Sequence, residues 1–355
     1  MRNKKICLLT TSLSSGGAEK MAANMSLSLS RRGYEVYVVS MKNEIDYEYA
    51  GTLYNFGKVK AQHNRFLAFL KFRAFFRQHQ FDVIIDHRVR DKFLKELLFA
   101  KLVFKSSKVV YCVHHYILEL YFSMVNIPLL LRQVLVKNRE IIVVSKVAKQ
   151  KIKEQLNFES KVIYNYIIPK RNVHEVGLSG GFIVAVGRLE NIKQFGVLIN
   201  AYHNSQLPKH NIKLFVLGEG CEREYLEQLI LKLNLQNYIE LLGFRNDADT
   251  YIKHSKALVM SSASEGFPMV LIEALALKTP VISFDCKSGP SEIIQHNING
   301  LLVEDQNSEK LTEAMDRMIL DKAFYNNIRN NLEQMPNPFS EENIMGQWVE
   351  FLGEF

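Results

Sequence analysis

Short runs of β-branched and other apolar residues alternate with helix-length segments along nearly the whole chain. This alternation predicts an α/β fold with parallel sheets, because each strand needs a crossover segment before the next parallel one. The first helix is expected over 18–32, with Gly33 as a natural C-terminal cap. The strands expected in the first half are Lys5–Leu9, Tyr34–Ser40, Val83–Asp86, Lys108–Val113 and Ile141–Ser145.

The strand-helix pattern starts again near residue 168, which predicts two doubly wound units. A chain of 355 residues also exceeds what one hydrophobic core usually serves. We expect a first domain over 1–168, a second over 169–335, and a final helix over 336–355 that packs back on the first domain. A linker is expected around residues 166–179. The strands of the second series are expected at Phe182–Val186, Ile212–Leu217, Tyr238–Leu241, Ala257–Met260 and Val281–Phe284.

Charge is distributed unevenly between the two halves. Residues 1–168 hold 28 Lys and Arg against 13 Asp and Glu, whereas residues 169–355 hold 17 against 24. A basic half joined to an acidic half suggests that the two meet different partners. No apolar run approaches the ~18 residues of a membrane span, and the basic start is better interpreted as a buried strand than as a signal peptide. The four scattered cysteines indicate neither a zinc site nor a disulfide framework, so we expect a cytoplasmic protein.

Two glutamates eight residues apart, Glu265 and Glu273, bracket a Gly-Phe-Pro turn that leads into an apolar helix. Pro268 suits the first helical position, because its missing N–H would be unsatisfied there in any case. The N–H groups of Met269 and Val270 then point outward from a helix start that carries partial positive charge, which can seat a phosphate. A carboxylate just beyond can accept hydrogen bonds from ribose hydroxyls, so the pair suggests a sugar nucleotide. The alternative is a capped, half-buried helix whose Glu273 is merely solvated.

Further candidates stand at strand ends, where doubly wound sheets bind their ligands. Arg188 and Lys193 follow one strand and place two cations on one loop, a sensible arrangement for a diphosphate. A Gly-Glu-Gly loop at 218–220 follows the next strand, and a glycine pair at 16–17 follows the first strand of the chain. Taken singly, each also fits an ordinary solvated loop or a tight turn.

Together these features resemble the large retaining glycosyltransferase family with the GT-B fold, called family 4 or glycosyl transferases group 1. The resemblance covers nearly the whole chain. Its most specific part is the E-x7-E segment with the preceding arginine and lysine, and weaker pieces arrive in the family's order. These pieces read GGAE, RRGYEVYVVS, IIVVSKVAKQKI and VIYNYIIP, then VGRLENIKQFGVLINAY, LGEG, LLGF, EGFPMVLIEALALKTPVI and GLLVED.

The resemblance implies two Rossmann-like domains that face a cleft, with the acceptor bound mainly by the first and the sugar nucleotide by the second. By position, Arg188 and Lys193 would bind the donor diphosphate and stabilise it as the leaving group. Glu273 would hold the ribose hydroxyls, and Glu265 would contact the transferred sugar. The remaining donor contacts would come from a backbone cradle and from the glycine pair of the first domain: Gly266, Phe267, Pro268, Met269 and Val270, with Gly16 and Gly17.

The implied activity is that of a hexosyltransferase of the EC 2.4 class that retains anomeric configuration. Front-face attack is the implied route, in which the leaving phosphate takes the acceptor's proton, and Glu265 need not be a covalent nucleophile. A UDP-sugar is the expected donor, and no metal cofactor is expected. A D-x-D motif at 247–249, which other glycosyltransferases use to hold a cation, is interpreted instead as a helix start.

Relatives often carry a histidine after the strand that corresponds to Lys108–Val113, where it contacts the transferred sugar. His114 is the preferred match here, and His115 is the alternative. A histidine pair that merely tops a strand is the other interpretation. Asp86 and His87, after the preceding strand, are candidates to line the acceptor side.

Two segments of the basic half suggest a membrane surface or a lipid-linked acceptor. Residues 116–136 are apolar enough to touch lipid. Residues 58–80 mix Lys and Arg with phenylalanines at helical spacing, a pattern that suits an anionic surface, although packing against the core is slightly favoured. We therefore expect a glycan or lipid-linked oligosaccharide as acceptor and a peripheral place on the inner face of the cytoplasmic membrane. The phenylalanines are Phe66, Phe69, Phe72, Phe75 and Phe76.

Other classes of function fit the sequence less well. The pI near 9.1 suggests nucleic-acid binding, but the basic half lacks a known recognition motif and the other half is acidic. An NAD-dependent dehydrogenase fails on the first glycine loop, which lacks the spaced G-x-G-x-x-G. The favoured hypothesis is a glycosyltransferase of cell-envelope polysaccharide, lipopolysaccharide or glycoconjugate synthesis. A sugar-nucleotide epimerase, a polymer synthase of similar fold and a non-catalytic sugar-nucleotide-binding relative remain alternatives.

Overall fold

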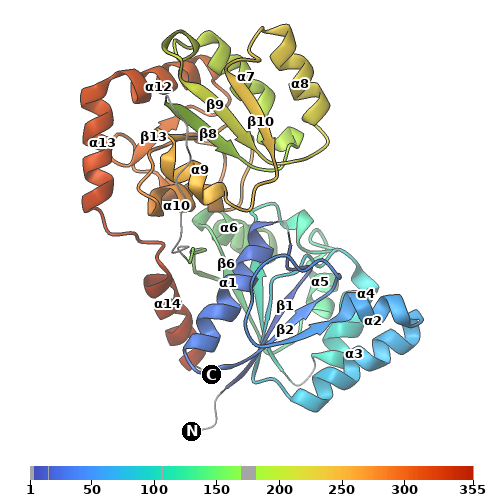
Figure 1. Ribbon diagram of the computed structural model, residues 1–355. Coiled ribbons are helices and arrows are strands. Elements are labelled where there is room, and N and C mark those ends of the chain that lie inside the picture. Colours follow the sequence, from blue (N-terminus) through green and yellow to red (C-terminus); the bar gives the residue numbers. More distant parts are fainter. Residues whose placement is uncertain (1–3, 15, 105–106, 169–180, 355) are drawn as a thin grey trace. The chain divides into compact units, whose positions relative to one another are not determined.

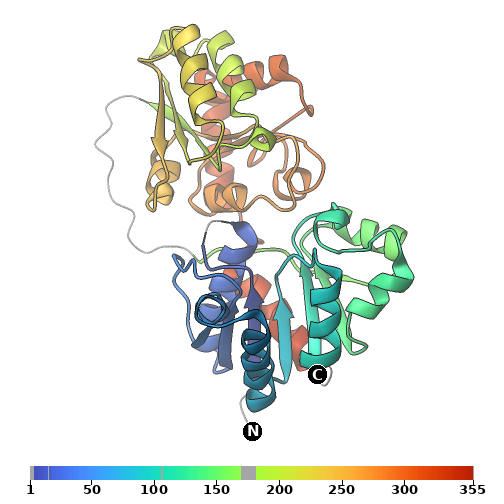
Figure 2. The same cartoon turned by 90° about the vertical axis from the view of Figure 1, so that its right-hand side faces the viewer.

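A computed structural model describes residues 4–14, 16–104, 107–168 and 181–354 of the protein. The chain forms two compact units, of which the first is Met1–Tyr166 with Glu341–Phe355 and the second is Ile167–Ser340. Each unit is a parallel sheet with helices on both faces (Figure 1, Figure 2). The expected α/β fold with two Rossmann-like units is therefore confirmed. Most of the linker expected at 166–179 lies outside the described residues.

The sheet of the first unit contains seven strands, all parallel to their neighbours. Its strands are β1 (Lys5–Thr10), β2 (Glu35–Ser40), β3 (Thr52–Asn55), β4 (Val83–Asp86), β5 (Lys108–Val113), β6 (Arg139–Val143) and β7 (Lys161–Val162). They lie in the order β3-β2-β1-β4-β5-β6-β7. The chain runs outward from β1 to β3 and then returns to the other side at β4, so β1 and β4 border the switch point where such sheets bind ligands.

Helices and apolar strand residues make the core of this unit. Ile6, Leu8 and Leu9 of β1 are completely buried, as expected for a central parallel strand. The helices are α1 (Gly17–Arg31), α2 (Phe56–Gln62), α3 (Arg65–His79), α4 (Phe93–Leu98), α5 (Pro128–Val134) and α6 (Lys146–Lys151), with short helical turns η1 (Phe99–Val103), η2 (Leu118–Leu120) and η3 (Ile152–Leu156). Gly33 follows α1 with a φ of 84°, the left-handed conformation expected of its cap.

The phenylalanine stripe of α3 packs mainly into the core. Phe72 and Phe76 are buried, and Phe69 and Phe75 pack against the same cluster. Phe66, by contrast, is 72% exposed. The slightly favoured core-packing interpretation of this stripe is therefore confirmed for four of its five phenylalanines.

The last helix, α14 (Glu341–Gly353), belongs to the first unit although it follows the second in the chain. Glu341 accepts hydrogen bonds from Ser28 Oγ at 2.8 Å and from Arg31 Nη2 at 2.9 Å, and both donors lie on α1. Lys4 Nζ donates to the carbonyl of Leu352 at 2.7 Å. Trp348 of α14 is buried, so the helix contributes apolar surface as well as these polar contacts.

The second unit is a six-stranded parallel sheet in the order β10-β9-β8-β11-β12-β13. Its strands are β8 (Phe182–Val186), β9 (Lys213–Leu217), β10 (Ile239–Gly243), β11 (Leu258–Met260), β12 (Val281–Phe284) and β13 (Gly300–Val303). The switch point lies between β8 and β11. The helices are α7 (Phe195–Asn204), α8 (Arg223–Lys232), α9 (Ala248–His254), α10 (Met269–Ala276), α11 (Pro290–Ile293), α12 (Ser308–Leu320) and α13 (Lys322–Gln334), with turns η4 (Asn191–Lys193) and η5 (Pro208–His210).

Three edge strands were not predicted from the sequence: β3, β7 and β13. The exposure of β3 and β7 explains their weak signal, since their residues are half-buried or exposed and show no apolar run.

A further observation concerns the helices. In the part of the chain that the structure describes, none combines the length and the apolar character needed to cross a bilayer.

Candidate functional site

Loops at the carboxyl ends of β8 and β11 are hydrogen-bonded to one another at the switch point of the second sheet. The N–H of Ala263, after β11, bonds to the carbonyl of Ile192, after β8, at 2.9 Å. Ser261 Oγ donates to the carbonyl of Lys193 at 2.9 Å. These bonds fix the backbone on both sides of the switch point, which is where doubly wound sheets take their ligands.

An ion pair joins the two loops. Lys193 Nζ lies 2.5 Å from Glu265 Oε1, and the two side chains are 22% and 12% exposed. Arg188 does not join this pair. Its side chain is 61% exposed and pairs with Glu190 at 2.7 Å. The structure thus brings together two of the predicted site residues that are 72 positions apart in sequence, and it leaves Arg188 at the solvent-exposed side of the same loop.

The loop after β9 comes into backbone contact with the loop after β8. Gly218 has a φ of 146°, and a Cβ added there would lie 1.8 Å from the carbonyl oxygen of Gly187. A residue with a side chain therefore does not fit at this position. The N–H of Leu189 bonds to the carbonyl of Glu219 at 2.9 Å. The Gly-Glu-Gly segment of the sequence therefore lets two strand-end loops pack backbone against backbone.

The helix after Glu265 begins one residue later than expected. Pro268 has a ψ of 107° and is the N-cap of α10 rather than its first residue. An extended ψ is the usual geometry of a residue that flanks a helix, and the carbonyl of Pro268 accepts a bond from the N–H of Leu271. Met269 and Val270 open the helix, and Glu273 lies half-buried in its second turn.

The loop after β12 packs against the Gly-Phe-Pro turn and supports it. Ser288 Oγ donates to the carbonyl of Gly266 at 2.8 Å. Gly289 has a φ of 102°, and a Cβ on it would lie 2.4 Å from Cδ of Pro268. The ring of Phe267 packs edge to face on Phe339, with centroids 5.3 Å apart. The predicted cradle residues 266–268 are therefore buried and fixed, and sequence reasoning did not find the 288–289 segment that supports them.

In the first unit, the glycine loop lies between β1 and α1. Gly16 is the N-cap of α1, Gly17 is its first residue, and the N–H of Gly16 donates to Tyr47 Oη at 3.1 Å. Leu13 pairs with Ile45 in an isolated parallel bridge. The loop is thus tied to the segment that follows β2.

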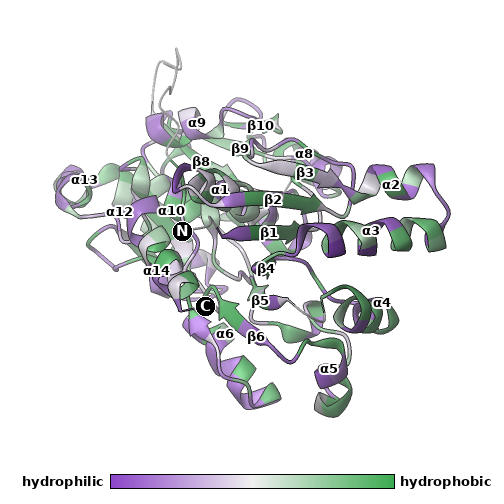
Figure 3. Cartoon of the chain, turned by 90° about the horizontal axis from the view of Figure 1, so that it is seen from below, coloured by the Kyte–Doolittle hydropathy of each residue, from purple (hydrophilic) through white to green (hydrophobic). Residues whose placement is uncertain are grey.

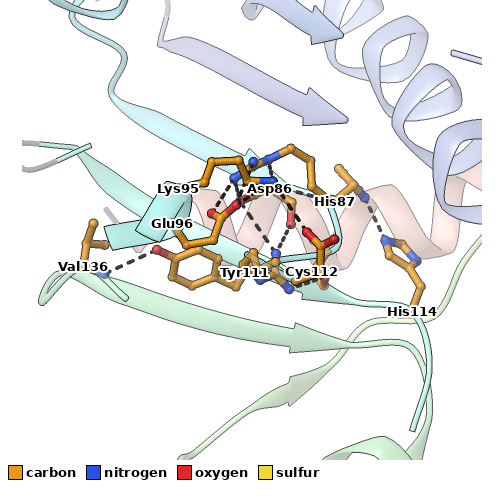
Figure 4. A network of polar contacts seen from close by, with 11 residues as sticks. Asp86, His87, Lys95, Glu96, Tyr111, Cys112, His114 and Val136 are labelled. Atoms are coloured by element: carbon orange, nitrogen blue, oxygen red, sulfur yellow. Dashed lines mark hydrogen bonds and ion pairs between the residues drawn. The ribbon is translucent and has the colours of Figure 1, made fainter. Parts of the chain in front are cut away.

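Four buried charged side chains form a network at the end of β4, in the loop after it and on α4; Figure 4 labels two of them, Asp86 and Glu96. Arg88 donates to Asp86 at 2.9 and 2.8 Å and to Glu96 at 3.1 and 3.3 Å. Arg90 Nη1 lies 3.6 Å from Asp86 Oδ2. Burial alone would raise the pKa of Asp86, but the charges and hydrogen bonds of the two arginines lower it overall. Among the buried side chains, two guanidiniums balance two carboxylates, and the half-buried Lys95 also pairs with Glu96 at 3.1 Å.

Two histidines meet where β4 and β5 end (Figure 4). His87 Nδ1 lies 2.9 Å from His114 Nε2, and the ring planes differ by 26°. Burial, with the charge of Arg90, lowers the pKa of His87 to about 3 and holds the pKa of His114 well below its usual value. Both rings are therefore neutral near pH 7. His115 is bonded elsewhere, because its Nδ1 accepts from the N–H of Ile117 at 3.1 Å.

Cys112 completes a group of three side chains whose ligand atoms lie within 4.8 Å of one another: His87, Cys112 and His114. Histidines that bind a metal normally donate their second ring N–H to a carboxylate or carbonyl. Here the second nitrogens, His87 Nε2 and His114 Nδ1, are buried without a hydrogen-bond partner among the described residues. The arrangement therefore fits a hydrogen-bonded imidazole pair better than a metal centre.

The D-x-D motif does form a helix start, as interpreted. Asp247 is the N-cap of α9, and Asp249 lies in its first turn. Both carboxylate oxygens of Asp247 accept hydrogen bonds from Arg245, each at 2.8 Å.

Comparison with protein families gives two matches. Residues 15–171 match the model described as Glycosyltransferase Family 4, and residues 169–335 match that of Glycosyl transferases group 1. Together the two models cover the chain from 15 to 335.

Relatives match over almost their whole length, among them two with named roles. An N-acetylgalactosamine-N,N'-diacetylbacillosaminyl-diphospho-undecaprenol 4-alpha-N-acetylgalactosaminyltransferase of Campylobacter jejuni is 28% identical over 98% of this chain and 99% of its own. The amylovoran biosynthesis glycosyltransferase AmsD of Erwinia amylovora is 26% identical over 98% of this chain and 99% of its own.

Solved structures share the fold. Anabaena Alr3699/HepE in complex with UDP and glucose has a TM-score of 0.78 at 20% identity, covering 99% of this chain and 100% of that one. Sucrose-phosphate synthase from Thermosynechococcus elongatus has a TM-score of 0.74 at 19% identity, covering 99% and 100%.

Proposed function

The chain belongs to the glycosyltransferase family built from these two modules, with the GT-B fold, and we propose that it moves a hexose from a UDP-sugar to a glycan or lipid-linked acceptor with retention of configuration. The observation that carries this proposal is the Lys193–Glu265 ion pair at the switch point of the second sheet. Cell-envelope polysaccharide or glycoconjugate synthesis is the proposed setting. One named relative acts on a diphospho-undecaprenol-linked sugar, and the other acts in amylovoran biosynthesis.

The donor would bind at the loops that meet around this pair. Lys193 and Arg188 place a point charge and a guanidinium fork on one loop, and both stabilise a diphosphate as negative charge develops on it. Glu265, held by Lys193, is the proposed contact of the transferred sugar, and Glu273 is the proposed partner of the ribose hydroxyls. The N–H groups of the α10 helix start supply further positive potential for a phosphate.

The test of donor binding is a thermal-shift screen against UDP-, GDP- and ADP-sugars. A ligand at 100 times its Kd stabilises the native state by about 2.7 kcal/mol, a shift of several degrees. We expect one UDP-sugar to give this shift in the wild type and to lose it in Arg188→Ala and Glu273→Ala. Arg245→Ala is the matched control, because Arg245 is also exposed and paired with its neighbour in a strand-end loop. No shift with any nucleotide sugar would contradict the proposal.

Chemistry is tested separately from binding. The assay measures sugar transfer to a lipid-linked glycan, and NMR determines the anomeric configuration of the product. A product with retained configuration distinguishes a retaining transferase from an epimerase, a polymer synthase or a relative that only binds the donor. We propose that no metal is required, so activity should persist in EDTA. An inverted product or complete loss of activity in EDTA would overturn the corresponding part of the proposal.

The acceptor side is proposed to face an anionic membrane. Figure 3 shows α3, α4 and α5 of the first unit with apolar segments among polar ones, and α4 packs against α5 while α3 packs against η1. Leu94 on α4 is 72% exposed, and Leu129 on α5 is 76% exposed. Apolar side chains that protrude from a unit with excess Lys and Arg suit insertion between anionic head groups. Further exposed members are Phe66, Leu67, Leu70, Leu98, Leu102, Leu120, Met124, Ile127 and Leu130.

Flotation with anionic liposomes tests this surface. We expect the wild type to float with the vesicles and a Leu94→Glu, Leu129→Glu double variant to stay unbound. Leu231→Glu is the matched control, since Leu231 is 49% exposed on α8 of the second unit, and it should float. A wild type that remains entirely unbound would contradict membrane association and leave the donor proposal untouched.

A further inference from the structure

His87 and His114 form a connected unit at the switch point of the first sheet. Their facing nitrogens, His87 Nδ1 and His114 Nε2, are 2.9 Å apart, a good hydrogen-bond length. The outward nitrogens, His87 Nε2 and His114 Nδ1, are covered and have no partner within the described ranges. A buried ring nitrogen without a partner costs free energy. A substrate hydroxyl that reaches His114 Nδ1 therefore gains a bond without breaking an internal one.

The backbone that carries His87 is tightly held. Its N–H bonds to the carbonyl of Leu9 in β1 at 2.8 Å. Three residues on, the N–H of Arg90 bonds to the carbonyl of Tyr121, and the carbonyl of Arg90 accepts from the N–H of Ser123 at 2.7 Å. His87 itself is 3% exposed. His114 directly follows β5, and the side-chain partner of its ring is His87.

The hydrogen bond between the rings contains one proton, which one of the two facing nitrogens carries. If His87 Nδ1 carries it, His114 accepts at Nε2 and, being neutral, carries its own proton on Nδ1. If His114 Nε2 carries it, His87 accepts at Nδ1 and carries its own proton on Nε2. The two rings therefore hold the same tautomer, both Nδ1–H or both Nε2–H.

We propose that His87 is a positioning residue for His114: its Nδ1 holds the His114 ring through Nε2, ties the tautomer of that ring to its own, and leaves Nδ1 of His114 for a hydroxyl of the transferred sugar or the acceptor. The proposal rests on the function proposed above. It extends that function by a residue that contacts no substrate itself. The neutral state of both rings suits this role, since protonation of both would put an N–H on each of the two facing nitrogens and break their bond.

The first test is nitrogen-15 NMR of the ¹⁵N-histidine-labelled full chain, without any substrate. The two resonances assigned by His87→Asn and His114→Asn should show neutral rings of one and the same tautomer. His87→Ala should release His114 into a mixture of tautomers, whereas His203→Asn, an exposed position of α7, should leave the signals unchanged. Different tautomers in the two wild-type rings, or a His114 spectrum unaffected by His87→Ala, would overturn the proposal.

The second test is steady-state kinetics. His87→Ala should lower kcat by about 10–100-fold with little change in the donor KM, because a misplaced group costs rate more than binding. His87→Asn should recover most of that loss, since the asparagine amide reaches the place of Nδ1. Equal loss in both variants, or wild-type kcat in His87→Ala, would refute the positioning role. A wild type that transfers no sugar would refute the proposed function, while the NMR result would still decide whether the pair exists.

Discussion

Removal of the Glu96 carboxylate should destabilise the first unit strongly. Glu96 is 3% exposed and accepts two hydrogen bonds from Arg88, whose side chain is 2% exposed. In Glu96→Ala a single carboxylate, Asp86, must serve two buried guanidiniums, so the cluster gains an uncompensated positive charge. Loss of one partner from a buried pair typically costs about 3–5 kcal/mol. Glu96→Gln should cost less, because the amide oxygen still accepts one of the bonds.

The chain's one tryptophan gives a direct assay. Trp348 lies on α14, is 3% exposed, and belongs to the same unit as Glu96. Its fluorescence in urea therefore follows the unit in question. With an m-value of about 2–3 kcal/mol/M, the expected loss lowers the midpoint by about 1–2.5 M.

Asp91→Asn supplies the control for the Glu96 variant. Asp91 is 56% exposed and lies 3.7 Å from Lys95, so its loss should cost no more than about 1 kcal/mol. If Glu96→Ala moved the tryptophan midpoint no further than Asp91→Asn does, the reasoning on buried charge balance would be refuted.

Three further outcomes are expected. The pKa of Asp86 is lowered in the folded unit, so its ionised carboxylate stabilises the unit above the unfolded pKa of about 3.9, and this stabilisation is lost as pH falls through the folded pKa. In Asp86→Asn the urea midpoint of tryptophan fluorescence should therefore fall less steeply with decreasing pH than in the wild type. An unchanged dependence of the midpoint on pH would contradict this. Gly218→Ala should destabilise the second unit by about 1–3 kcal/mol from backbone conformation alone, and the added Cβ would also clash with the carbonyl of Gly187. Urea unfolding followed by circular dichroism measures this loss. Wild-type stability would contradict the close approach of Gly218 to Gly187. Gly346→Ala should act in the opposite sense, stabilising α14 by about 0.5–1 kcal/mol, since a Cβ there meets nothing within 4 Å; a lowered tryptophan midpoint would contradict it.

Most of the strands could be predicted from sequence patterns, because the central strands are buried on both faces and carry unbroken apolar runs. Strands such as Val83–Asp86 and Phe182–Val186 were predicted with their observed bounds. The edge strand Thr52–Asn55 has no fully buried residue, and so it left no apolar signal. Pro268 was placed one position too far into its helix, because helix-cap geometry depends on a ψ angle that the residue type does not specify.

Contacts between distant charged residues were harder to foresee. The residues of the Lys193–Glu265 pair were both candidates, yet their contact depends on how two strand-end loops fold. Arg88, Arg90 and Glu96 were not candidates at all, because charged residues beside a strand end normally indicate solvent. Asp86, immediately after an apolar run, was the one hint that this loop turns inward. The supporting role of Ser288 and Gly289 likewise has no local signal in the sequence.

The place of α14 in the first unit has a consequence for synthesis on the ribosome. The second unit is a continuous stretch, Ile167–Ser340, and can complete its contacts as soon as that stretch has emerged. The first unit, although most of it is made earlier, then still lacks the helix that covers α1 and carries Glu341 and Trp348. The surface of the N-terminal half that α14 covers therefore stays exposed for the entire time in which the C-terminal half is translated.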